Sequence, residues 1–510
     1  MAFFLSLVMI MAMGLTAFAD ETETYTLTVN NTGTTEHIFE LYQIFTGDLS
    51  DDGTLSNIQW GAGVTDAGKK QFEDASTKAA SLNENNAKDF ANSLAQFLTS
   101  PTTSTGVSAN SSYKFDNLTA GYYLVKDKDG TQINGGSYTS FIMKVTGNET
   151  VSTKLGVPTV EKKVKDINDS SDSETEQWHD SADYDIGDLV PYKITGTMPS
   201  NIDSYSTYKY VFTDTMSKGL TYTASTDEKK SFTVTLYTSN EDETGIDITN
   251  HFTEAIADYE GLDLEYAGGK VITWTCDNLK EIDGVTLNKE TKVVVTYSAK
   301  LDNSAVIGST GNPNKVYLTY SNNPNQGGDR DTGKTPEDKN IVFTYKVVVN
   351  KVNEKDEPLY GAGFTLQKKV NGQYTDIKTI GPKNDKKEEM TTFEFTGLDD
   401  GDYKLIESTT PSGYNTIDSI EFTISATHDE TSDDPKLTDL SGNAPSGEAT
   451  FTPKESDGSL TTNVVNEKGS TLPSTGGRGT TMIYIIGAAL VITAGVVLVM
   501  RKKMSSDKEA

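Results

Sequence analysis

Two lysines and two carboxyl residues occupy positions where period-two strands would point them into an apolar core. Lys351 and Lys162 each alternate with valines, while Glu407 and Asp214 alternate with aromatic or aliphatic residues. A buried unpaired charge is costly, so such residues need a reason to be there. Burial lowers the pKa of a lysine and raises that of a carboxyl, so a neutral amine could attack beside a protonated acid. The alternative interpretation is that both lysines lie on exposed strand faces.

Composition excludes several classes of function. The 510 residues carry 44 basic and 74 acidic side chains, for a net charge of -30, which repels nucleic-acid backbones. Four scattered histidines and the single Cys276 cannot form a zinc site of familiar spacing, so we expect no metal and no cofactor. The acidic tract 166–176 lacks the Gly and final Glu of an EF-hand loop and is interpreted as a solvated loop.

The two ends of the chain predict export. Residues 1–19 are mostly apolar and end in Ala-Phe-Ala, which predicts a signal peptide, although the usual basic start is missing. Residues 481–500 are uncharged and mostly apolar, and 20 residues in a helix span the hydrocarbon layer of about 30 Å. The basic residues at the start of the tail 501–510 hold that tail in the cytoplasm, so the rest of the mature chain lies outside.

A pentapeptide precedes the membrane segment and consists of Leu472, Pro473, Ser474, Thr475 and Gly476. Followed by an apolar span and a basic tail, it resembles the cell-wall sorting signal of Gram-positive surface proteins. The resemblance implies a sortase whose Cys thiolate attacks the Thr475 carbonyl and expels Gly476. An amine then resolves the acyl-enzyme, so the protein becomes covalently attached to a partner.

The exported part has mainly period-two patterning, with strands separated by Asn, Asp, Gly and Ser turns. This predicts an all-β fold of three tandem Ig-like, Cna-type sandwiches. The exception is residues 65–99, where Phe90, Leu94, Phe97 and Leu98 have helical spacing, so the first domain carries a helical insertion.

An internal echo supports the division into domains. The pattern Phe-x-x-Leu-x-x-Gly-x-Tyr at residues 115–123 recurs at residues 395–403, each as a strand, a tight turn and a strand. Two related sandwiches are therefore expected to flank a different one. The predicted boundaries are an N-terminal domain at 20–155, a middle domain at 156–323, a linker at 324–340 and a C-terminal domain at 341–468.

These features together resemble the Gram-positive major pilins that sortases assemble. Residues 403–414 resemble the pilin E-box, and residues 351–366 resemble the opening of a Cna B-type domain that closes at 464–466. The middle region is similar to the second domain of major pilins at residues 158–164, 212–215 and 316–324.

The resemblance implies intramolecular isopeptide bonds between a Lys in the first strand of a domain and an Asn in its last, assisted by a buried acid. In the C-terminal domain it pairs Lys351 with Asn466, with Glu407 as the helper. In the middle domain it pairs Lys162 with Asn322, with Asp214 as the helper, and Asn314 is the alternative to Asn322. Each bond would give the covalent closure that disulfides provide in other exported proteins.

The first domain departs from this scheme. Its opening strand lacks a lysine, so no isopeptide bond is expected there, and Asp127, which corresponds to Glu407, is interpreted as a turn or surface residue. Pilin subunits carry an acceptor lysine just after this domain, and Lys154 has that place, although the usual Tyr-Pro context is absent. An ordinary junction lysine is the alternative interpretation.

The sequence thus predicts a structural pilus subunit, joined by sortase to neighbouring pilin subunits and finally to peptidoglycan at the cell surface. A wall-anchored adhesin or minor pilin that is not polymerised is the alternative. A surface hydrolase is not favoured, because the sequence shows no Ser-His-Asp or metal constellation. No feature identifies a host ligand.

Overall fold

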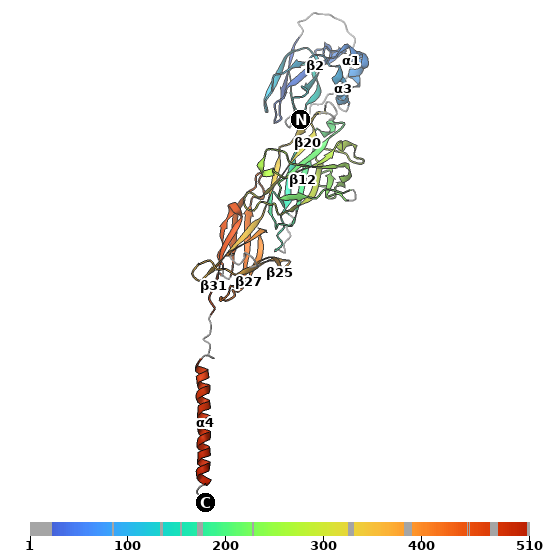
Figure 1. Cartoon of the computed structure of the whole chain (residues 1–510). Helices are drawn as coiled ribbons and strands as arrows, with labels where there is room; N and C mark the ends of the chain where they lie inside the picture. The colour runs from blue at the N-terminus through green and yellow to red at the C-terminus, as the bar shows by residue number, and fades with distance from the viewer. Residues whose placement is uncertain are drawn as a thin grey trace.

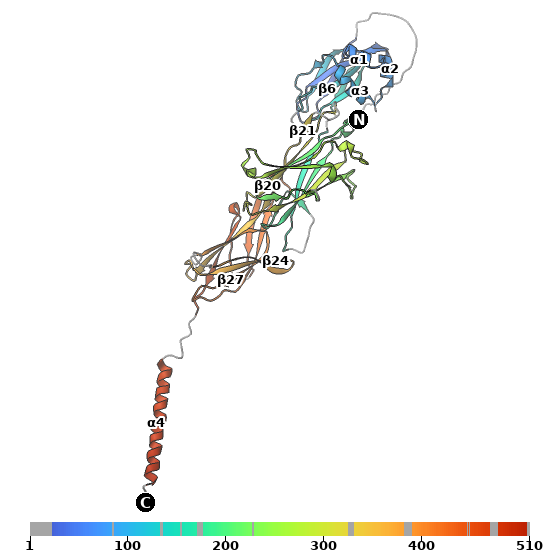
Figure 2. The ribbon, with the colours of Figure 1, turned by 45° about the vertical axis from the view of Figure 1, so that its right-hand side comes forward.

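The protein is built from three β modules that follow one another along an elongated molecule, with helix α4 beyond the third (Figure 1; Figure 2). The computed structural model describes residues 23–83, 86–132, 136–153, 156–170, 177–226, 229–324, 331–381, 390–445, 447, 449–469 and 478–506. The predicted all-β tandem architecture is confirmed. The signal peptide predicted at 1–19 lies outside the described residues.

The first module packs a small sheet against a larger one. The small sheet has the order β5-β1-β8, with β1 parallel to β8, and the larger has the order β3-β2-β6-β7, with β4 beside β2. The strands are β1 Tyr25–Asn30, β2 Phe39–Leu49, β3 Leu55–Trp60, β4 Thr102–Thr103, β5 Ser112–Leu118, β6 Gly121–Asp127, β7 Ser140–Val145 and β8 Glu149–Ser152.

Three short helices cover the outer face of the larger sheet, as the pattern at 65–99 predicted. They are α1 Asp66–Gln71, α2 Ala75–Ser81 and α3 Ala87–Leu94, followed by the 3₁₀ turn η1 Ala95–Phe97. The side chains of Thr65 and Asp74 cap the first two helices by accepting hydrogen bonds from backbone amides. Phe90 of α3 stacks on Phe45 of β2. Strand β6 is therefore covered on both faces and buried along its whole length.

The echoed motif forms the same corner in the first and third modules. In each case the two strands do not pair with one another, because the turn between them crosses from one sheet to the other. The hydroxyl of Tyr123 donates a hydrogen bond to the Thr119 carbonyl at 2.8 Å, and that of Tyr403 donates to the Asp399 carbonyl at 2.8 Å. This is the tyrosine corner known from β-sandwiches. The two modules are thus built alike.

The second module is a larger sandwich of two seven-stranded sheets. The first sheet contains β9 Val160–Lys165, β10 Trp178–His179, β12 Leu189–Thr197, β14 Leu220–Tyr222, β15 Phe232–Tyr237, β16 Ile246–Asp247 and β19 Lys292–Leu301. The second contains β11 Ser181–Asp183, β13 Tyr210–Met216, β17 Thr253–Asp258, β18 Lys270–Cys276, β20 Asn312–Ser321, β21 Thr332–Lys334 and β22 Asp338–Phe343. Short 3₁₀ turns are η2 Ile202–Ser204, η3 Thr249–His251, η4 Leu264–Tyr266 and η5 Leu279–Glu281.

The structure corrects the prediction of a linker at 324–340. Strands β21 and β22 both pair with β20, and β22 also pairs with β11, so they extend a sheet of the second module. The polar composition of this stretch suggested a spacer, but its described residues 332–334 and 338–340 pair with β20 in the sheet. The second module therefore continues to Phe343, and β23 of the third module begins two residues later.

The third module packs a four-stranded sheet against a five-stranded one. The first contains β23 Tyr345–Asn353, β26 Thr392–Leu398, β30 Thr452–Lys454 and β31 Ser459–Asn466, with the turn η8 Glu455–Asp457. The second contains β24 Gly363–Val370, β25 Gln373–Ile380, β27 Gly401–Thr409, β28 Ile420–His428 and β29 Leu437–Asn443. The first and last strands, β23 and β31, run parallel as direct neighbours.

Helix α4, Arg478–Ser506, contains the apolar segment predicted at 481–500. Residues Met482–Lys502 have a mean hydropathy of 2.6 and are long and apolar enough to cross a membrane, by length and composition.

The first two modules are joined through a buried asparagine. The side-chain amide of Asn322 donates to the main-chain carbonyls of Gln132 at 2.6 Å and Gly136 at 3.0 Å. The main-chain amide of Tyr138 donates to the main-chain carbonyl of Asn322 at 2.8 Å. Asn322 is fully buried, so these bonds form away from competing water.

Replacing this asparagine should loosen the first junction. Asn322→Ala leaves two buried carbonyls without their donor, a loss of about 1–3 kcal/mol. We expect amide hydrogen exchange at Tyr138 to rise by about tenfold or more. Asn303→Ala, at an exposed position of the same module, is the control. Unchanged exchange at Tyr138 would show that Asn322 does not hold the junction.

Candidate functional site

In the third module, the lysine and asparagine of interest lie on the paired terminal strands. The parallel register sets Lys351 of β23 opposite Val464 of β31, and Asn353 opposite Asn466. Lys351 is fully buried, and its amine donates to the carbonyls of Val464 at 2.7 Å and Val352 at 3.0 Å. The predicted inward face of this lysine is therefore the observed one.

Asn466 forms a tight pair with the predicted helper. Its amide nitrogen donates to both carboxylate oxygens of Glu407, at 2.9 and 3.1 Å, and to the Asn415 carbonyl at 2.8 Å. Its Oδ1 is buried without a hydrogen-bond partner, so the carbonyl is free to be polarised or attacked. The Ile417 amide donates to Glu407 at 3.1 Å and helps to hold the carboxyl in place.

Burial also adjusts the amine. Desolvation lowers the pKa of Lys351 to about 8, although the charge of Glu407 acts in the opposite direction. A substantial fraction of this amine is therefore neutral and nucleophilic near physiological pH, as sequence reasoning required.

In the second module, four polar side chains meet in a core that excludes water. The Lys162 amine donates to Asp214 and, at 2.6 Å, to the Tyr297 hydroxyl. That hydroxyl donates to the other Asp214 oxygen at 2.8 Å and accepts from the Asn314 amide at 2.9 Å. Asn314 Oδ1 is buried without a partner, as Asn466 Oδ1 is in the third module. Each module thus brings a buried lysine, carboxyl and carboxamide into one region.

Desolvation acts in opposite directions on the two charged groups. Burial lowers the pKa of Lys162, and the charge of Asp214 opposes that change. Burial likewise raises the pKa of Asp214, and Lys162 opposes it. Both shifts favour a neutral amine beside a protonated acid, the combination that amide exchange requires.

The selection of Asn322 as the partner of Lys162 is a correction. Asn322 lies at the first junction, bonded to Gln132 and Gly136, whereas Asn314 is the asparagine beside Lys162 and Asp214. Asn314 lies in β20 and Asn322 directly follows it, and both have the same parity, so alternation could not separate them. The antiparallel register sets Asn314 opposite Met216 of β13. Met216 lies two residues after Asp214, the carboxyl that Lys162 contacts.

Tyr297 is the residue that sequence reasoning missed. It contacts Lys162, Asp214 and Asn314 together, and its ring stacks on Tyr192 at 5.2 Å between centroids. The available signal was its position within the inward run of β19 that starts at Val293 and ends at Leu301. Alternation does not distinguish such a tyrosine from ordinary core packing, because its hydroxyl partners come from other strands.

Asp127 of the first module is another correction. It is fully buried, bonded to the His37 ring at 2.8 Å and to the Thr139 amide at 2.6 Å, and burial raises its pKa. It was expected in a turn or at the surface, but it ends a strand that is covered on both faces. The opening strand β1 contains no lysine, whereas the opening strands β9 and β23 of the other two modules do.

Two predicted sites lie outside the described residues. They are the acceptor lysine, Lys154, and the sorting pentapeptide, Leu472 to Gly476.

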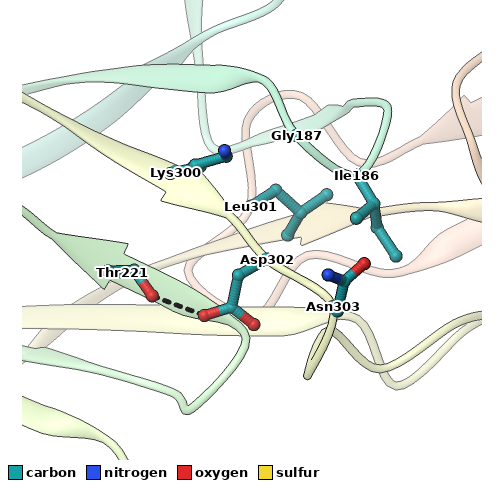
Figure 3. A pocket seen from close by; sticks show the side chains of 7 residues that line it. All are labelled: Ile186, Gly187, Thr221, Lys300, Leu301, Asp302 and Asn303. Carbon is teal, nitrogen blue, oxygen red and sulfur yellow. Dashed lines mark hydrogen bonds between the residues drawn. The ribbon is translucent and has the colours of Figure 1, made fainter.

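A cavity of about 370 Å³ lies on the second module (Figure 3). Its ionisable lining groups are Lys300 and Asp302, and the Asp302 carboxylate accepts a hydrogen bond from Thr221. These lining residues contain no nucleophile with an adjacent base, so the cavity gives the hydrolase alternative no support. The remaining lining residues are Ile186, Gly187, Leu301 and Asn303.

Comparison with protein families gives three matches in consecutive order. The Gram-positive pilin backbone subunit 2, Cna-B-like domain matches residues 186–324, and a prealbumin-like fold domain matches residues 345–436. The LPXTG cell wall anchor motif matches residues 464–506, a range that includes Thr475. Together these ranges cover more than half of the chain.

Individual relatives agree with these matches. The chain is 27% identical over 415 residues to the trypsin-resistant surface T6 protein of Streptococcus pyogenes serotype M6, covering 70% of this chain and 71% of the relative. The structure of the T6 backbone pilin from that serotype has a TM-score of 0.53 and 20% identity, covering 88% of this chain and 100% of the other, which supports the shared fold. The major pilin SpaD of Corynebacterium diphtheriae gives a TM-score of 0.48 at 17% identity, covering 89% and 99%. The chain is therefore similar to Gram-positive pilin backbone proteins over most of its length, and it carries an LPXTG cell-wall anchor motif.

Proposed function

We propose that this chain is the repeating subunit of a covalent surface pilus, and that its second and third modules each close on an intramolecular Lys–Asn isopeptide bond. The observation that carries the proposal is the buried lysine, carboxyl and carboxamide in each of these modules. The pairs are Lys351 with Asn466, assisted by Glu407, and Lys162 with Asn314, assisted by Asp214. The only chemistry proposed for the chain is this reaction with itself.

The reaction proceeds by amide exchange within the fold. The neutral lysine nitrogen attacks the asparagine Cγ, the new Nζ–Cγ bond forms, the Cγ–Nδ2 bond breaks, and ammonia leaves with the proton lost by the amine. The adjacent acid hydrogen-bonds the carboxamide and transfers the proton. Folding holds both groups in place, and such proximity lowers a barrier by roughly 7–11 kcal/mol.

The two bonds have different topologies. In the third module, β23 and β31 are neighbours in one sheet, so the bond joins adjacent terminal strands. In the second module, β9 and β20 belong to opposite sheets, so the bond crosses the sandwich. Strands β21 and β22 follow Asn314 in the chain, so this bond closes on a strand that is not the last of its module.

The first prediction is a mass deficit. Each bond releases one ammonia, about 17 Da, so the purified chain should be about 34 Da lighter than its sequence mass. Proteolytic digestion should recover Lys351 and Asn466 in one branched peptide, and Lys162 and Asn314 in another. Intact-mass and fragment spectra measure both, and a chain at full sequence mass would refute the chemistry.

A matched pair of variants tests the partner of Lys162. Asn314→Ala should restore about 17 Da, whereas Asn322→Ala should retain the full deficit, because that side chain bonds to the first module. If the deficit shrank in Asn322→Ala and not in Asn314→Ala, Asn322 rather than Asn314 would be the partner of Lys162.

Removing the third-module bond should also lower stability. Asn466→Ala opens a loop of more than 100 residues, so the module should lose on the order of 4–5 kcal/mol by the disulfide model of loop entropy. Chemical denaturation of the third-module transition measures this loss. Because Asn466→Ala also removes hydrogen bonds to Glu407, Lys351→Arg provides a second unlinked variant. Equal stability of the linked and unlinked chains would contradict the proposed closure.

Polymerisation is proposed to use Lys154. Sortase cleaves the bond between Thr475 and Gly476 and holds the new carboxyl end as a thioester, which the Lys154 amine of the next subunit resolves. The last subunit is transferred to peptidoglycan instead. This assignment rests on the position of Lys154 just after the first module and on the LPXTG match.

Co-expression with the pilus sortase tests this step. The chain should form a denaturant-resistant ladder of high-mass species, which Lys154→Arg should abolish because the more basic guanidinium does not act as the acceptor. Lys128→Arg, at an exposed position of the first module, should keep the ladder. A single wall-linked band for the unmodified chain would favour the adhesin or minor pilin instead.

A further inference from the structure

Seven aspartates gather where the second module meets the third. Five come from the second module and two from the turn between β26 and β27, where Asp399 and Asp400 lie. The basic groups beside them are Lys368 and His428. The five from the second module are Asp166, Asp169, Asp183, Asp185 and Asp188.

The two modules are closely docked at this place. The Ile186 amide donates to the Gly397 carbonyl at 3.0 Å. Gly397 has a φ of +79°, and a Cβ atom there would come within 2.6 Å of the Ile186 side chain. The aspartates from the two modules are therefore held together by the fold. Asp166 and Asp169 belong to this cluster, so the start of the acidic tract is not the solvated loop that its composition suggested.

Lys368 neutralises only part of the cluster. It bonds to Asp185 at 2.6 Å and to Asp399 at 3.2 Å, with Asp169 at 3.6 Å. Burial opposes its charge, but Asp399 and Asp185 outweigh that effect and raise the pKa of Lys368 above its usual value. One ammonium cannot balance the remaining carboxylates.

Asp183 is the residue that points to a ligand. It is only 3% exposed, and its Oδ2 is buried without a hydrogen-bond partner. Asp183, Asp399 and Asp400 each place a carboxylate oxygen within 4.8 Å of the other two. The Tyr345 side chain interacts with this carboxyl, but a buried carboxylate oxygen that accepts no hydrogen bond is disfavoured, so this oxygen needs a proton or a cation.

We propose that Asp183, Asp399 and Asp400 bind a calcium ion that bridges the second and third modules. Carboxylate oxygens are hard ligands, which favours Ca²⁺ or Mg²⁺ over the softer transition metals. Ca²⁺ accepts irregular sets of six to eight oxygens, whereas Mg²⁺ requires near-ideal octahedral geometry. The ligands come from a strand end and a turn of two different modules, which matches the tolerance of Ca²⁺.

The ligands are already held in position. The Asp400 amide donates to the Asp399 carboxylate at 2.9 Å, and the Asp399 amide donates to Asp185 at 2.9 Å. The Asn168 amide donates to Asp400. These bonds orient the turn before a cation arrives, which lowers the entropy cost of binding.

Protons are the competing ligand. Burial, followed by the charge of Asp183, raises the pKa of Asp400 to about 7 and that of Asp399 well above its usual value. Burial and the same neighbour raise the pKa of Asp166 to about 8. Cation binding should therefore release protons and weaken as the pH falls below 7. The other ionisable groups around the cluster are Asp169, Asp185, Asp188, Lys368, His428, Glu430, Tyr184, Tyr345 and Tyr403.

Calorimetric titration of the detergent-solubilised full-length chain with CaCl₂ at pH 8 tests the site. The chain is first stripped of metal with EDTA, and the EDTA is then removed. We expect one site with a dissociation constant on the order of 10⁻⁴ M, within the range of extracellular calcium modules. Asp183→Asn and Asp400→Asn should each weaken binding at least tenfold. Asp283→Asn, an exposed aspartate of the second module, should leave it unchanged. Calcium binding that is insensitive to Asp183→Asn would place the ion elsewhere and overturn the proposal.

MgCl₂ and ZnCl₂ titrations identify the class of ion. His428 Nε2 lies 3.8 Å from Asp166 and 4.0 Å from Asp183, so a zinc site would use this histidine. Weaker magnesium binding and calcium binding that survives His428→Gln would support the proposal. Tight zinc binding that is lost in His428→Gln, without calcium binding, would overturn it.

Thermal unfolding and hydrogen exchange of the unmodified chain give a test without variants. A carboxyl with a raised folded-state pKa stabilises the fold below its unfolded pKa, near 4, and loses this contribution as the pH rises through 7–8. In EDTA, the junction should therefore weaken between pH 6 and 8.5, and calcium should restore its protection at pH 8.5 but not at pH 5.5. If calcium changes neither the melting temperature nor the exchange at residues 183–188 and 398–402 at pH 8.5, protons alone neutralise the cluster and the proposal fails.

Discussion

The cost of burying a charged amine is the constraint on which this structure depends. Lys351 and Lys162 have no solvent exposure, and each core sets a carboxyl and a carboxamide near the buried amine. Desolvation lowers the pKa of both lysines and raises the pKa of Asp214, which favours a neutral nucleophile in each core and a proton donor in the second module. The same burial that would destabilise an ordinary sandwich thus supplies the conditions for the proposed crosslinks. The covalent closure proposed for the second and third modules would resist unzipping under tension along the chain.

The modules meet this constraint through different strand arrangements. The third module has parallel terminal strands side by side, and its lysine and asparagine are offset by two residues across one ladder. The second module reaches its asparagine across the sandwich, with Tyr297 joining all three groups through hydrogen bonds. The first module has a buried acid, Asp127, which pairs with His37 instead of a lysine. It shares the tyrosine corner with the third module. Related architecture therefore does not require the same chemistry.

Module interiors and module junctions are held by different forces. Hydrogen bonds from Asn322 link the first two modules, and an aspartate cluster around Lys368 links the second to the third. Both junctions therefore depend on noncovalent contacts, whereas the bonds proposed for the second and third modules lie inside those modules.

Much of this protein followed from its sequence alone. Alternation predicted the sandwiches and the inward faces of Lys351, Lys162, Asp214 and Glu407, and helical spacing predicted the insertion at 65–99, because both are local properties of the chain. Only the tertiary structure could decide between Asn314 and Asn322, which share one strand face but lie about 26 Å apart along an extended strand. It also revealed the burial of Asp127, the role of Tyr297, and an aspartate cluster assembled from segments more than 200 residues apart. Strand periodicity shows which way a side chain points, but the residues it meets depend on the register between distant segments, which the packing of the buried face and the turn geometry set.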